Sequence, residues 1–502
     1  MVRLPPARGR EHGPLRTGQQ RGHLVPGPPR RGRGHGDFLR RGRLLPHGRH
    51  LGGASSVSLF SGERVAVWGA ARSGVAAANL LVSLGADVVL SDVRAESMTG
   101  PATGPVPGLD PRVDLRFGGN VIDGARFVVP SPGIMPSAAV FDAARRAGAT
   151  IVGEIELAAS VALAPIVAIT GTDGKSTTTE MIGAMSRASG RPTVVAGNIG
   201  VPLSERVRDV GPDGLIVAEV SAFQLWSCGR FRPRVAVMTN LAADHIDYFG
   251  NDAAAYAQAK ARVFVDQGEG DTAILRADDP GVMSMAIPRG VRRTTFGLLS
   301  EADWVVDADV IRRGREAVLR ADELRVRGRH NLLNAASALA AGDALGLPFG
   351  PMLDALRTFE GLPHRMQHVR RLHGLTYIDD SKATNPHAAR VGLLSLSSSY
   401  VAIVGGFDKG LDQSELVDEL AARARAVVLI GGTAERTRLE IGVRLPVRVA
   451  TTMEEAVVVA TALAREGDAV VLSPAASSFD LYRDYHHRGQ AFQDAVGQLS
   501  ED

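Results

Sequence analysis

Short apolar runs alternate with amphipathic stretches along most of the chain, and this alternation predicts repeated strand–helix units. The first unit has strands at 64–68 and 87–92 around a helix at 75–84. A second series opens with an apolar strand at 165–170, followed by a helix at 178–188. Units of this kind are typical of a mainly parallel sheet covered by helices on both faces.

Further apolar runs extend the second series and form a third one. Those at 214–220 and 235–240 continue the second series. The third series has five runs with helical stretches between them, at 375–379, 400–404, 426–430, 446–449 and 469–472. Five strands with four intervening helices predict a complete doubly wound α/β domain.

The length of 502 residues requires more than one domain, because a single hydrophobic core stops growing near ~250–300 residues. We expect three α/β domains with boundaries near residues 153 and 362, the second within the linker 360–364. The predicted domains are 57–153, 154–362 and 363–502, preceded by an extension at 1–56.

The extension differs sharply in composition from the rest of the chain. It holds twelve arginines, twelve glycines and seven prolines against two acidic residues. A segment without periodic apolar residues cannot offset its ordering entropy, so we expect it to be disordered. We interpret it as an unselected extension, with translation starting near Val57. An arginine-rich arm that contacts nucleic acid or acidic lipid is the alternative.

Net charge and cysteine content narrow the class of protein. The whole chain has a formal net charge of +3, but residues 57–502 carry 45 basic against 52 acidic side chains, a net charge of −7. A mildly acidic body argues against nucleic-acid binding by the folded domains. No apolar run reaches the ~18–20 residues of a membrane-spanning helix. Cys228 is the only cysteine, which excludes an intramolecular disulfide and fits a cytoplasmic protein.

The strongest local motif is Gly171-Thr-Asp-Gly-Lys-Ser-Thr177, between a predicted strand and a predicted helix. Backbone N–H groups of such a loop converge on phosphate oxygens, Lys175 offsets their charge, and Ser176 can ligate Mg²⁺. The motif is shorter than the usual P-loop, because Ile169 lies where its first glycine would fall. We predict that ATP or GTP binds here.

The first glycine turn along the chain, 69–74, follows the first predicted strand. It is similar to the turn of dinucleotide-binding domains, but Ala71 replaces the middle glycine, and its side chain hinders the approach of a pyrophosphate. NAD binding is therefore disfavoured. Asp92 ends the next strand, where a carboxylate suits a ribose or sugar hydroxyl.

Lysine is rare in this chain, which has 53 arginines and four lysines. Each lysine therefore indicates a position at which arginine fails. Lys175 lies in the phosphate loop, and Lys260 lies on a predicted helix. Lys382 and Lys409 follow strands of the third domain, where doubly wound sheets bind ligands. We expect all four lysines to be functional.

Acidic residues and a histidine follow two strands of the central domain. Glu219 lies in the apolar run 214–220, while Asp244 and His245 come after the run 235–240. Carboxylate and imidazole groups at strand ends can hold Mg²⁺ beside a triphosphate. We predict that Glu219 and His245 belong to a metal site.

These residues resemble those of the Mur ligases, ATP-dependent enzymes that form amide bonds in peptidoglycan synthesis. The resemblance covers about residues 57–500. The last two of its motifs are specific for the branch of the family that adds D-glutamate to UDP-N-acetylmuramoyl-L-alanine. The motifs are Gly171–Thr177 with Gly197-Asn-Ile-Gly200, Glu219-Val-Ser-Ala-Phe-Gln224, Gly361-Leu-Pro-His-Arg365, and Asp380-Ser-Lys-Ala-Thr-Asn385.

The resemblance implies binding roles for three sets of residues. The UDP-linked substrate would contact Arg72, Ser73, Asp92, Arg94, Ser131 and Asn198. ATP would contact Gly171, Thr172, Asp173, Gly174, Lys175, Ser176, Thr177, Thr178, Asn331, Asn334, Arg365 and Asp380, with Asn331 and Asn334 placed for its adenine. D-Glutamate would contact Lys382, Thr384, Lys409, Ser478, Phe479 and Tyr485.

The resemblance also implies two Mg²⁺ sites. Ser176 and Glu219 would hold one ion, and His245 and Lys260 would attend the other. In the family the lysine at the Lys260 position carries a carbamate derived from CO₂, which explains why arginine cannot replace it. The implied catalytic residues are Lys175, Glu219, His245 and Lys260.

The fold class that follows is a three-domain α/β protein. A Rossmann-like first domain holds the uridine nucleotide, a P-loop-type central domain holds ATP, and a doubly wound Rossmann-like third domain holds the amino acid. The implied reaction passes through an acyl phosphate and a tetrahedral intermediate on a monomeric enzyme. The alternatives are another Mur-type or folylpolyglutamate ligase, a P-loop ATPase switch that uses the basic arm, and a nicotinamide dehydrogenase.

The sequence departs from the family pattern at three places. Ala70-Ala71 replaces Leu-Gly in the first glycine turn, and Ser221-Ala222 replaces a pair of serines. Asp173 replaces the commoner asparagine in the phosphate loop and adds negative charge near the phosphates.

Overall fold

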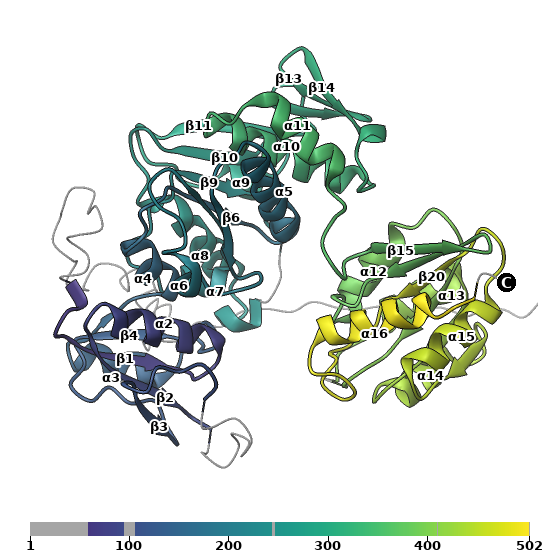
Figure 1. Cartoon of the computed structure of the whole chain (residues 1–502), viewed down its shortest axis with the longest axis horizontal. Helices are drawn as coiled ribbons and strands as arrows, with labels where there is room; N and C mark the ends of the chain where they lie inside the picture. Colours follow the sequence, from purple (N-terminus) through teal and green to yellow (C-terminus); the bar gives the residue numbers. More distant parts are fainter. Residues whose placement is uncertain (1–58, 95–105, 243–245, 409, 501–502) are drawn as a thin grey trace, which may run out of the picture. The chain divides into compact units, whose positions relative to one another are not determined.

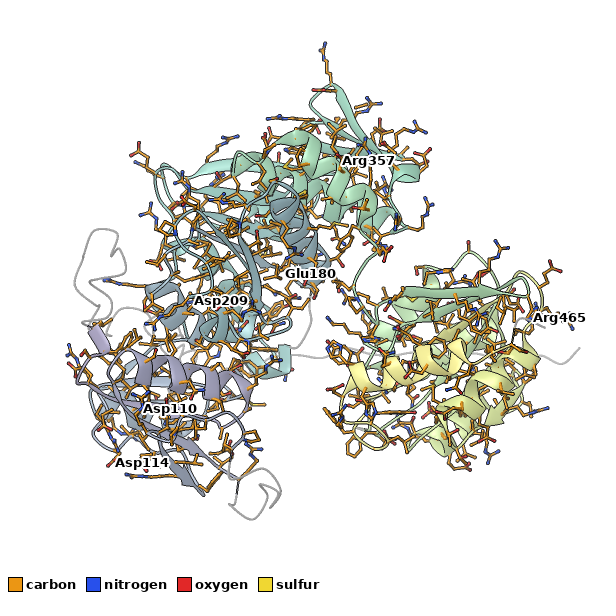
Figure 2. The ribbon with its side chains drawn as sticks, viewed as in Figure 1. Asp110, Asp114, Glu180, Asp209, Arg357 and Arg465 are labelled. Atoms are coloured by element: carbon orange, nitrogen blue, oxygen red, sulfur yellow. The ribbon has the colours of Figure 1, made fainter. Side chains whose placement is uncertain are left out.

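The computed structural model describes residues 59–94, 106–242, 246–408 and 410–500, and it contains three separate sheets (Figure 1). Each sheet falls within one of the three predicted domain ranges. The boundaries at 153 and 362 themselves stay a prediction, and the extension 1–56 lies outside the described residues. Charged side chains such as Asp209 and Arg465 are exposed at the surface (Figure 2). Among the described residues, no helix is long and apolar enough to cross a membrane.

The first sheet is parallel, with the strand order β3-β2-β1-β4-β5. Trp68 and Phe141 meet edge to face in its apolar core, with ring centroids 5.5 Å apart. The predicted unit of strand, glycine turn, helix and strand is confirmed as β1, α2 and β2. The elements are β1 (Arg64–Trp68), α2 (Arg72–Ser83), β2 (Asp87–Asp92), β3 (Asp114–Phe117), β4 (Phe127–Pro130), α3 (Ala139–Arg146) and β5 (Thr150–Ile151).

The central sheet has nine strands in the order β14-β13-β12-β11-β10-β9-β6-β8-β7. Residues of α5, α10 and α11 form one apolar cluster with its strands. The strands are β6 (Ile166–Thr170), β7 (Thr193–Gly197), β8 (Leu215–Glu219), β9 (Val235–Met238), β10 (Thr272–Arg276), β11 (Arg292–Gly297), β12 (Trp304–Asp307), β13 (Val310–Arg313) and β14 (Glu316–Arg320). The helices are α4 (Glu154–Ser160), α5 (Lys175–Ala188), α6 (Leu203–Arg206), α7 (Ala222–Leu225), η3 (Ile246–Phe249), α8 (Ala253–Val265), α9 (Pro280–Met283), η4 (Ala321–Glu323), α10 (Arg329–Ala344) and α11 (Phe349–Thr358).

The expectation of a parallel central sheet is wrong at one edge. β12, β13 and β14 pair antiparallel. Two residues separate each pair of strands, and Ala308 and Gly314 in these turns have positive φ values of 49° and 56°. A two-residue hairpin joins only antiparallel neighbours, so these turns determine the direction of the edge strands.

The third sheet has the order β15-β16-β20-β17-β18-β19, and all pairs except β15 with β16 are parallel. The five predicted strands and four intervening helices are confirmed, while β15 and α16 were not predicted. The strands are β15 (Gln367–Leu372), β16 (Leu375–Asp379), β17 (Tyr400–Val404), β18 (Ala424–Leu429), β19 (Val447–Val449) and β20 (Ala469–Leu472). The helices are α12 (Pro386–Leu394), α13 (Ser414–Arg423), α14 (Ala434–Ile441), α15 (Met453–Leu463) and α16 (Tyr485–Gly497).

Candidate active site

The first glycine turn is held by Asp92 at the end of β2. Its Oδ2 accepts a hydrogen bond of 2.7 Å from the Ala70 backbone N–H, and its Oδ1 accepts two bonds of 2.9 Å from the backbone and Nε of Arg94. These hydrogen bonds from Arg94 and Ala70 hold the pKa of the Asp92 carboxyl at about 2. The carboxylate therefore fixes the turn and orients Arg94, in addition to its predicted role toward a sugar hydroxyl.

The other residues predicted for the UDP-linked substrate in this domain surround the same turn. Arg72 and Ser73 lie in the second half of the turn, where α2 begins. Ser131 follows β4, and a Cβ added to Gly69 would lie 2.7 Å from the Ser131 Cβ. The turn needs glycine at position 69, because its φ of 94° disfavours any other residue and Ser131 fills the space.

The phosphate loop lies between β6 and α5, as the sequence predicted. The Asn240 side chain binds both backbone polar groups of Asp173. Its Oδ1 accepts a hydrogen bond of 2.8 Å from the Asp173 N–H, and its Nδ2 donates one of 3.1 Å to the Asp173 carbonyl. Thr239 Oγ1 also donates to that carbonyl, at 2.6 Å. Sequence reasoning assigned no role to Thr239 or Asn240, although both follow β9 at the same edge of the sheet.

Lys175 begins α5, and its Nζ donates to the Thr172 carbonyl at 2.7 Å. The ammonium group thus lies over its own loop, where phosphate oxygens would meet the helix N-terminus. Ser176, Thr177 and Thr178 follow it and are buried. Asp173 is exposed, and Asn240 and Thr239 hold its backbone N–H and carbonyl.

Glu219 lies at the end of β8, next to β6 in the sheet, and is 2% exposed. The Asn198 side chain donates from Nδ2 to Glu219 Oε1 at 2.7 Å. Glu219 Oε2 is buried and accepts no hydrogen bond from any described residue. A buried carboxylate oxygen without a protein donor fits a hard cation such as Mg²⁺, which prefers oxygen ligands.

Lys260 lies on α8 and is 2% exposed. Its Nζ donates to the Gly171 carbonyl at the start of the phosphate loop and lies 4.7 Å from the centroid of the Tyr256 ring. The Tyr256 hydroxyl in turn lies 3.3 Å from Thr172 Oγ1. The structure therefore brings Lys260 to the phosphate loop, a position that the pattern of lysine use did not indicate.

Two predicted site residues, His245 and Lys409, lie outside the described residues, as does Asp244. Within the described ranges, no group of three or more histidine, cysteine, aspartate or glutamate side chains forms a metal-binding cluster. Both predicted metal sites therefore stay predictions.

Asn331 and Asn334, predicted for adenine, lie on the first turns of α10. Asn334 Nδ2 donates to Asn331 Oδ1 at 3.3 Å. A Cβ added to Gly174 would lie 2.3 Å from Asn334 Oδ1, so Gly174 permits the phosphate loop to approach this helix. The predicted adenine residues and the phosphate loop are thus neighbours.

The peptide around Arg365 is held from both sides. His364 and Met366 have positive φ values of 60° and 44°, which are uncommon outside glycine. The His364 Nδ1 lies 2.7 Å from Asp379 Oδ2, and the Met366 N–H donates to Asp380 Oδ1 at 3.2 Å. These contacts present the exposed Arg365 at the carboxyl end of β16.

Asp380 is buried below that peptide. Its Oδ2 accepts from Ser473 Oγ at 2.9 Å, and burial raises the pKa of its carboxyl to about 7. Both carboxylate oxygens thus have protein partners, so Asp380 holds the Arg365 peptide, while its role toward ATP stays a prediction.

Those residues predicted for the amino acid that the structure describes follow β16 and β20. Lys382 Nζ lies 5.8 Å from the centroid of the Tyr485 ring, and burial together with the charge of Arg365 lowers the pKa of Lys382. Ser478 is buried, whereas Phe479 is 69% exposed. Thr384 lies between β16 and α12, with its backbone N–H bonded to the Lys382 carbonyl.

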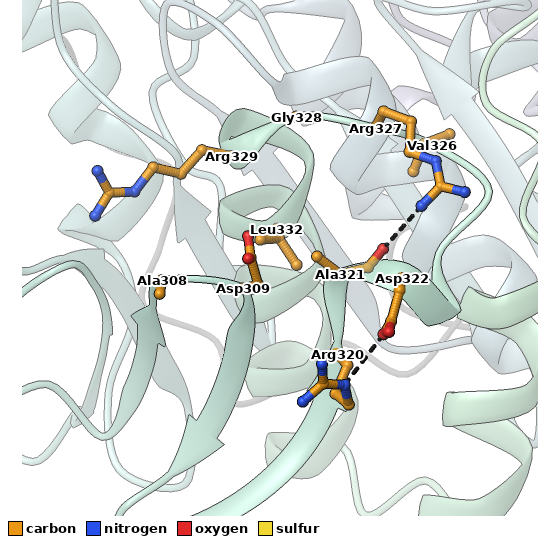
Figure 3. Close-up of a pocket in the computed structure, with 10 residues that line it drawn as sticks. All are labelled: Ala308, Asp309, Arg320, Ala321, Asp322, Val326, Arg327, Gly328, Arg329 and Leu332. Carbon is orange, nitrogen blue, oxygen red and sulfur yellow. Dashed lines mark hydrogen bonds and ion pairs between the residues drawn. The ribbon is translucent and has the colours of Figure 1, made fainter.

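A cavity of about 520 Å³ lies beside the start of α10 (Figure 3). Arg320 pairs with Asp322 at 3.2 Å, and Arg327 donates to the Ala321 carbonyl at 3.4 Å. None of the predicted site residues lines it. Its lining residues are Ala308, Asp309, Arg320, Ala321, Asp322, Val326, Arg327, Gly328, Arg329 and Leu332.

Two family models match the chain. The Mur ligase middle domain matches residues 169–342, and the Mur ligase glutamate ligase domain matches residues 364–476. A UDP-N-acetylmuramoylalanine–D-glutamate ligase of Pelotomaculum thermopropionicum is 40% identical over 457 residues, which cover 88% of this chain and 99% of the relative. A ligase of the same name from Geobacter metallireducens is 41% identical over 448 residues, with coverages of 88% and 98%.

A solved structure is similar in fold. The UDP-N-acetylmuramate–alanine ligase MurC of Thermotoga maritima aligns with a TM-score of 0.57 at 19% identity, covering 87% of this chain and 99% of that one. At this identity the likeness bears on the fold alone, and it agrees with the three-domain α/β architecture.

Proposed function

We propose that this chain, which belongs to the Mur ligase family, joins D-glutamate to UDP-N-acetylmuramoyl-L-alanine at the expense of ATP. The reaction is a step of peptidoglycan precursor synthesis and so of cell wall biogenesis. The relatives named for this reaction are about 40% identical over most of the chain. The observation that carries the proposal is the grouping of Lys175, Glu219 and Lys260 around one phosphate loop.

The proposed chemistry begins with the substrate's terminal L-alanine carboxylate, which attacks the γ-phosphorus of ATP and displaces ADP. The resulting acyl phosphate is a far better acylating group, and the D-glutamate amine then displaces phosphate through a tetrahedral intermediate. Lys175 and the N-terminus of α5 offset charge on the transferred phosphoryl group. Lys382 and the loop that carries Ser478 bind the D-glutamate carboxylates.

We further propose that Glu219 and Ser176 hold one Mg²⁺, and that His245 and Lys260 support a second. The unpartnered Oε2 of Glu219 fits this role. The ions, when bound, neutralise charge on the nucleotide phosphates. Asn198 fixes the orientation of the Glu219 carboxylate, and Asn240 fixes the loop that faces it.

Lys260 is proposed to carry a carbamate formed from CO₂. Its Nζ is buried at the start of the phosphate loop, beside the Gly171 carbonyl and the Tyr256 ring. The product bears a carboxylate, which a guanidinium in the same place could not supply. We also propose that the enzyme acts as a monomer in the cytoplasm.

The function is tested by phosphate release from ATP. Purified protein is given UDP-N-acetylmuramoyl-L-alanine with D-glutamate, L-glutamate, L-alanine, L-lysine or meso-diaminopimelate. Release with D-glutamate alone is the expected result. Phosphate release with another of these amino acids would still indicate a ligase but would refute D-glutamate as its substrate. Release that is independent of any amino acid would favour an ATPase.

A further inference from the structure

The helix α16 carries an arginine, Arg488, that is 1% exposed. Its guanidinium uses all three nitrogens. Nε donates to Ser381 Oγ at 3.0 Å, Nη2 donates to the Ser381 carbonyl at 2.8 Å, and Nη1 donates to the Ala476 carbonyl at 2.9 Å. One side chain thus joins two loops that are far apart in the sequence.

Both loops carry residues of the proposed D-glutamate site. Ser381 stands between Asp380 and Lys382 after β16, and Ala476 stands two residues before Ser478 after β20. β16 and β20 are neighbours in the sheet. The spacing between Lys382 and Ser478 therefore depends on how these two loops are fastened together.

The loop after β20 has a strained backbone, which hydrogen bonds from other segments hold in place. Ala475 has a φ of 61°, in the left-handed region that disfavours residues with a side chain. The Gly405 N–H donates to the Pro474 carbonyl at 2.8 Å, and the Phe407 N–H donates to the Ser477 carbonyl at 2.8 Å. With the bond from Arg488 to Ala476, three donors hold the carbonyls of this loop in place.

The environment of Arg488 indicates that position, rather than charge, is what the residue supplies. Burial lowers the pKa of its guanidinium to about 10, and the charges of Asp480, Asp379 and Asp380 act against this shift. Burying a cation is unfavourable unless its hydrogen bonds are satisfied. Two of the three acceptors are main-chain carbonyls, which fix backbone rather than balance charge.

We propose that Arg488 is a positioning residue that sets the distance between the two loops binding the D-glutamate carboxylates. This inference rests on the proposed function. The planar fork of arginine reaches three acceptors in two directions at once, which the single ammonium of lysine cannot do. Arg488→Lys should therefore loosen the site even though the positive charge is kept.

The test compares Arg488→Lys with Arg370→Lys in the same domain. Arg370 also donates to two main-chain carbonyls, those of Val496 and Leu499, at the far end of α16. Arg488→Lys should raise the KM for D-glutamate about tenfold, as expected when one to two buried hydrogen bonds are lost. The KM values for ATP and for the UDP-linked substrate should change less than about twofold. Arg370→Lys should leave all three KM values unchanged.

Ser381→Ala keeps the proposal testable if Arg488→Lys does not fold, because it removes only the hydroxyl acceptor. It should raise the KM for D-glutamate by less than Arg488→Lys. An unchanged KM for D-glutamate in an active variant, or an equal rise in all three KM values, would overturn the proposal. A wild-type chain that releases phosphate without D-glutamate would overturn the proposed function, and this inference with it.

Discussion

The Asn198 amide nitrogen lies 2.7 Å from Oε1 of Glu219, and Oε2 of the same carboxylate has no partner among the described residues. One oxygen is thus fixed by protein and the other is left for a ligand. This relationship assigns Asn198 a second role beside the one expected toward the UDP-linked substrate. It also leads to the first prediction.

Asn198→Ala should lower kcat about 10- to 100-fold, the usual effect of removing a group that orients a metal ligand. The Mg²⁺ concentration needed for half-maximal activity should rise. Phosphate release measured across a Mg²⁺ titration checks both. Asn79→Ala is the matched control, since the Asn79 side chain binds the Gly108 carbonyl and the Asp110 N–H in the first domain. An unchanged Mg²⁺ requirement in Asn198→Ala would show that Glu219 does not depend on the amide.

Lys260→Ala should lower kcat by at least about 10- to 100-fold, because a carboxylate that supports a metal is lost with the carbamate. Lys260→Arg should be no better, since a guanidinium forms no carbamate. Millimolar acetate or formate should restore part of the activity of Lys260→Ala by supplying a carboxylate. Phosphate release with and without acetate checks this. Activity of Lys260→Arg close to that of the wild type would contradict the carbamate.

Lys382 should make D-glutamate binding sensitive to alkaline pH. Burial and the charge of Arg365 lower the pKa of its ammonium group, so it loses its proton below the ordinary lysine value of 10.5. The neutral amine attracts a carboxylate less, and the KM for D-glutamate should rise as pH increases toward that value. The arginine of Lys382→Arg stays charged over this pH range, so its KM for D-glutamate should not show this rise. Identical pH profiles of KM in the two proteins would exclude the assignment.

The sequence predicted most of the strands that position the site, because apolar runs of four to six residues followed by glycine or acidic residues are strong local signals. β6, β8 and β16 were predicted in this way, with Lys175, Glu219 and Lys382 at or after their ends. Such placements depend only on strand order and direction, which α/β folds repeat.

What the sequence did not indicate depends on long-range contacts. Asn240 and the Asp173 N–H that it binds in the phosphate loop are 67 residues apart in the sequence. Arg488 and Ser381, which are also hydrogen-bonded, are 107 residues apart. Lysine stood out because it is rare, but Arg488 is one of 53 arginines and carries no such signal. The antiparallel edge β12–β14 was missed because its strands are only four or five residues long and each includes a charged residue, so none gives a long apolar run.

Asp380 should make the stability of the chain depend on pH between about 4 and 7. Burial raises the pKa of its carboxyl from the ordinary 3.8 to about 7, so the folded state keeps a proton that the unfolded chain releases. The contribution of Asp380 to the free energy of unfolding is fully present below about pH 4. It decreases by about 2–4 kcal/mol as the pH rises to about 7. Asp380→Asn carries no such proton and should not show that loss.

Urea unfolding of both proteins at several pH values checks this. The difference in unfolding free energy, wild type minus Asp380→Asn, should decrease steadily as pH rises. Other titrating groups are common to both proteins and cancel in the difference. A difference that is constant with pH, or that increases, would show that Asp380 is ionised in the folded state.

Gly489 on α16 should not tolerate alanine. A Cβ at this position would lie 2.1 Å from His364 Nδ1 and 2.8 Å from Asp379 Oδ2, where the two side chains form their buried pair. Alanine favours a helix over glycine by up to about 1 kcal/mol, but forcing a methyl group into a filled core costs about 1–3 kcal/mol. The steric cost exceeds the gain in helix preference, so Gly489→Ala should lower the free energy of unfolding and with it the urea midpoint.

Gly497 ends the same helix and is the matched control, because a Cβ there would meet no atom within 4 Å. Gly497→Ala should leave the midpoint unchanged or raise it slightly, since only the helix preference acts. Gly489→Ala should also raise the KM for ATP, because His364 holds the peptide that presents Arg365. Equal midpoints for the two variants would show that His364 moves aside at little cost and that the strained turn at 364–366 does not depend on this contact.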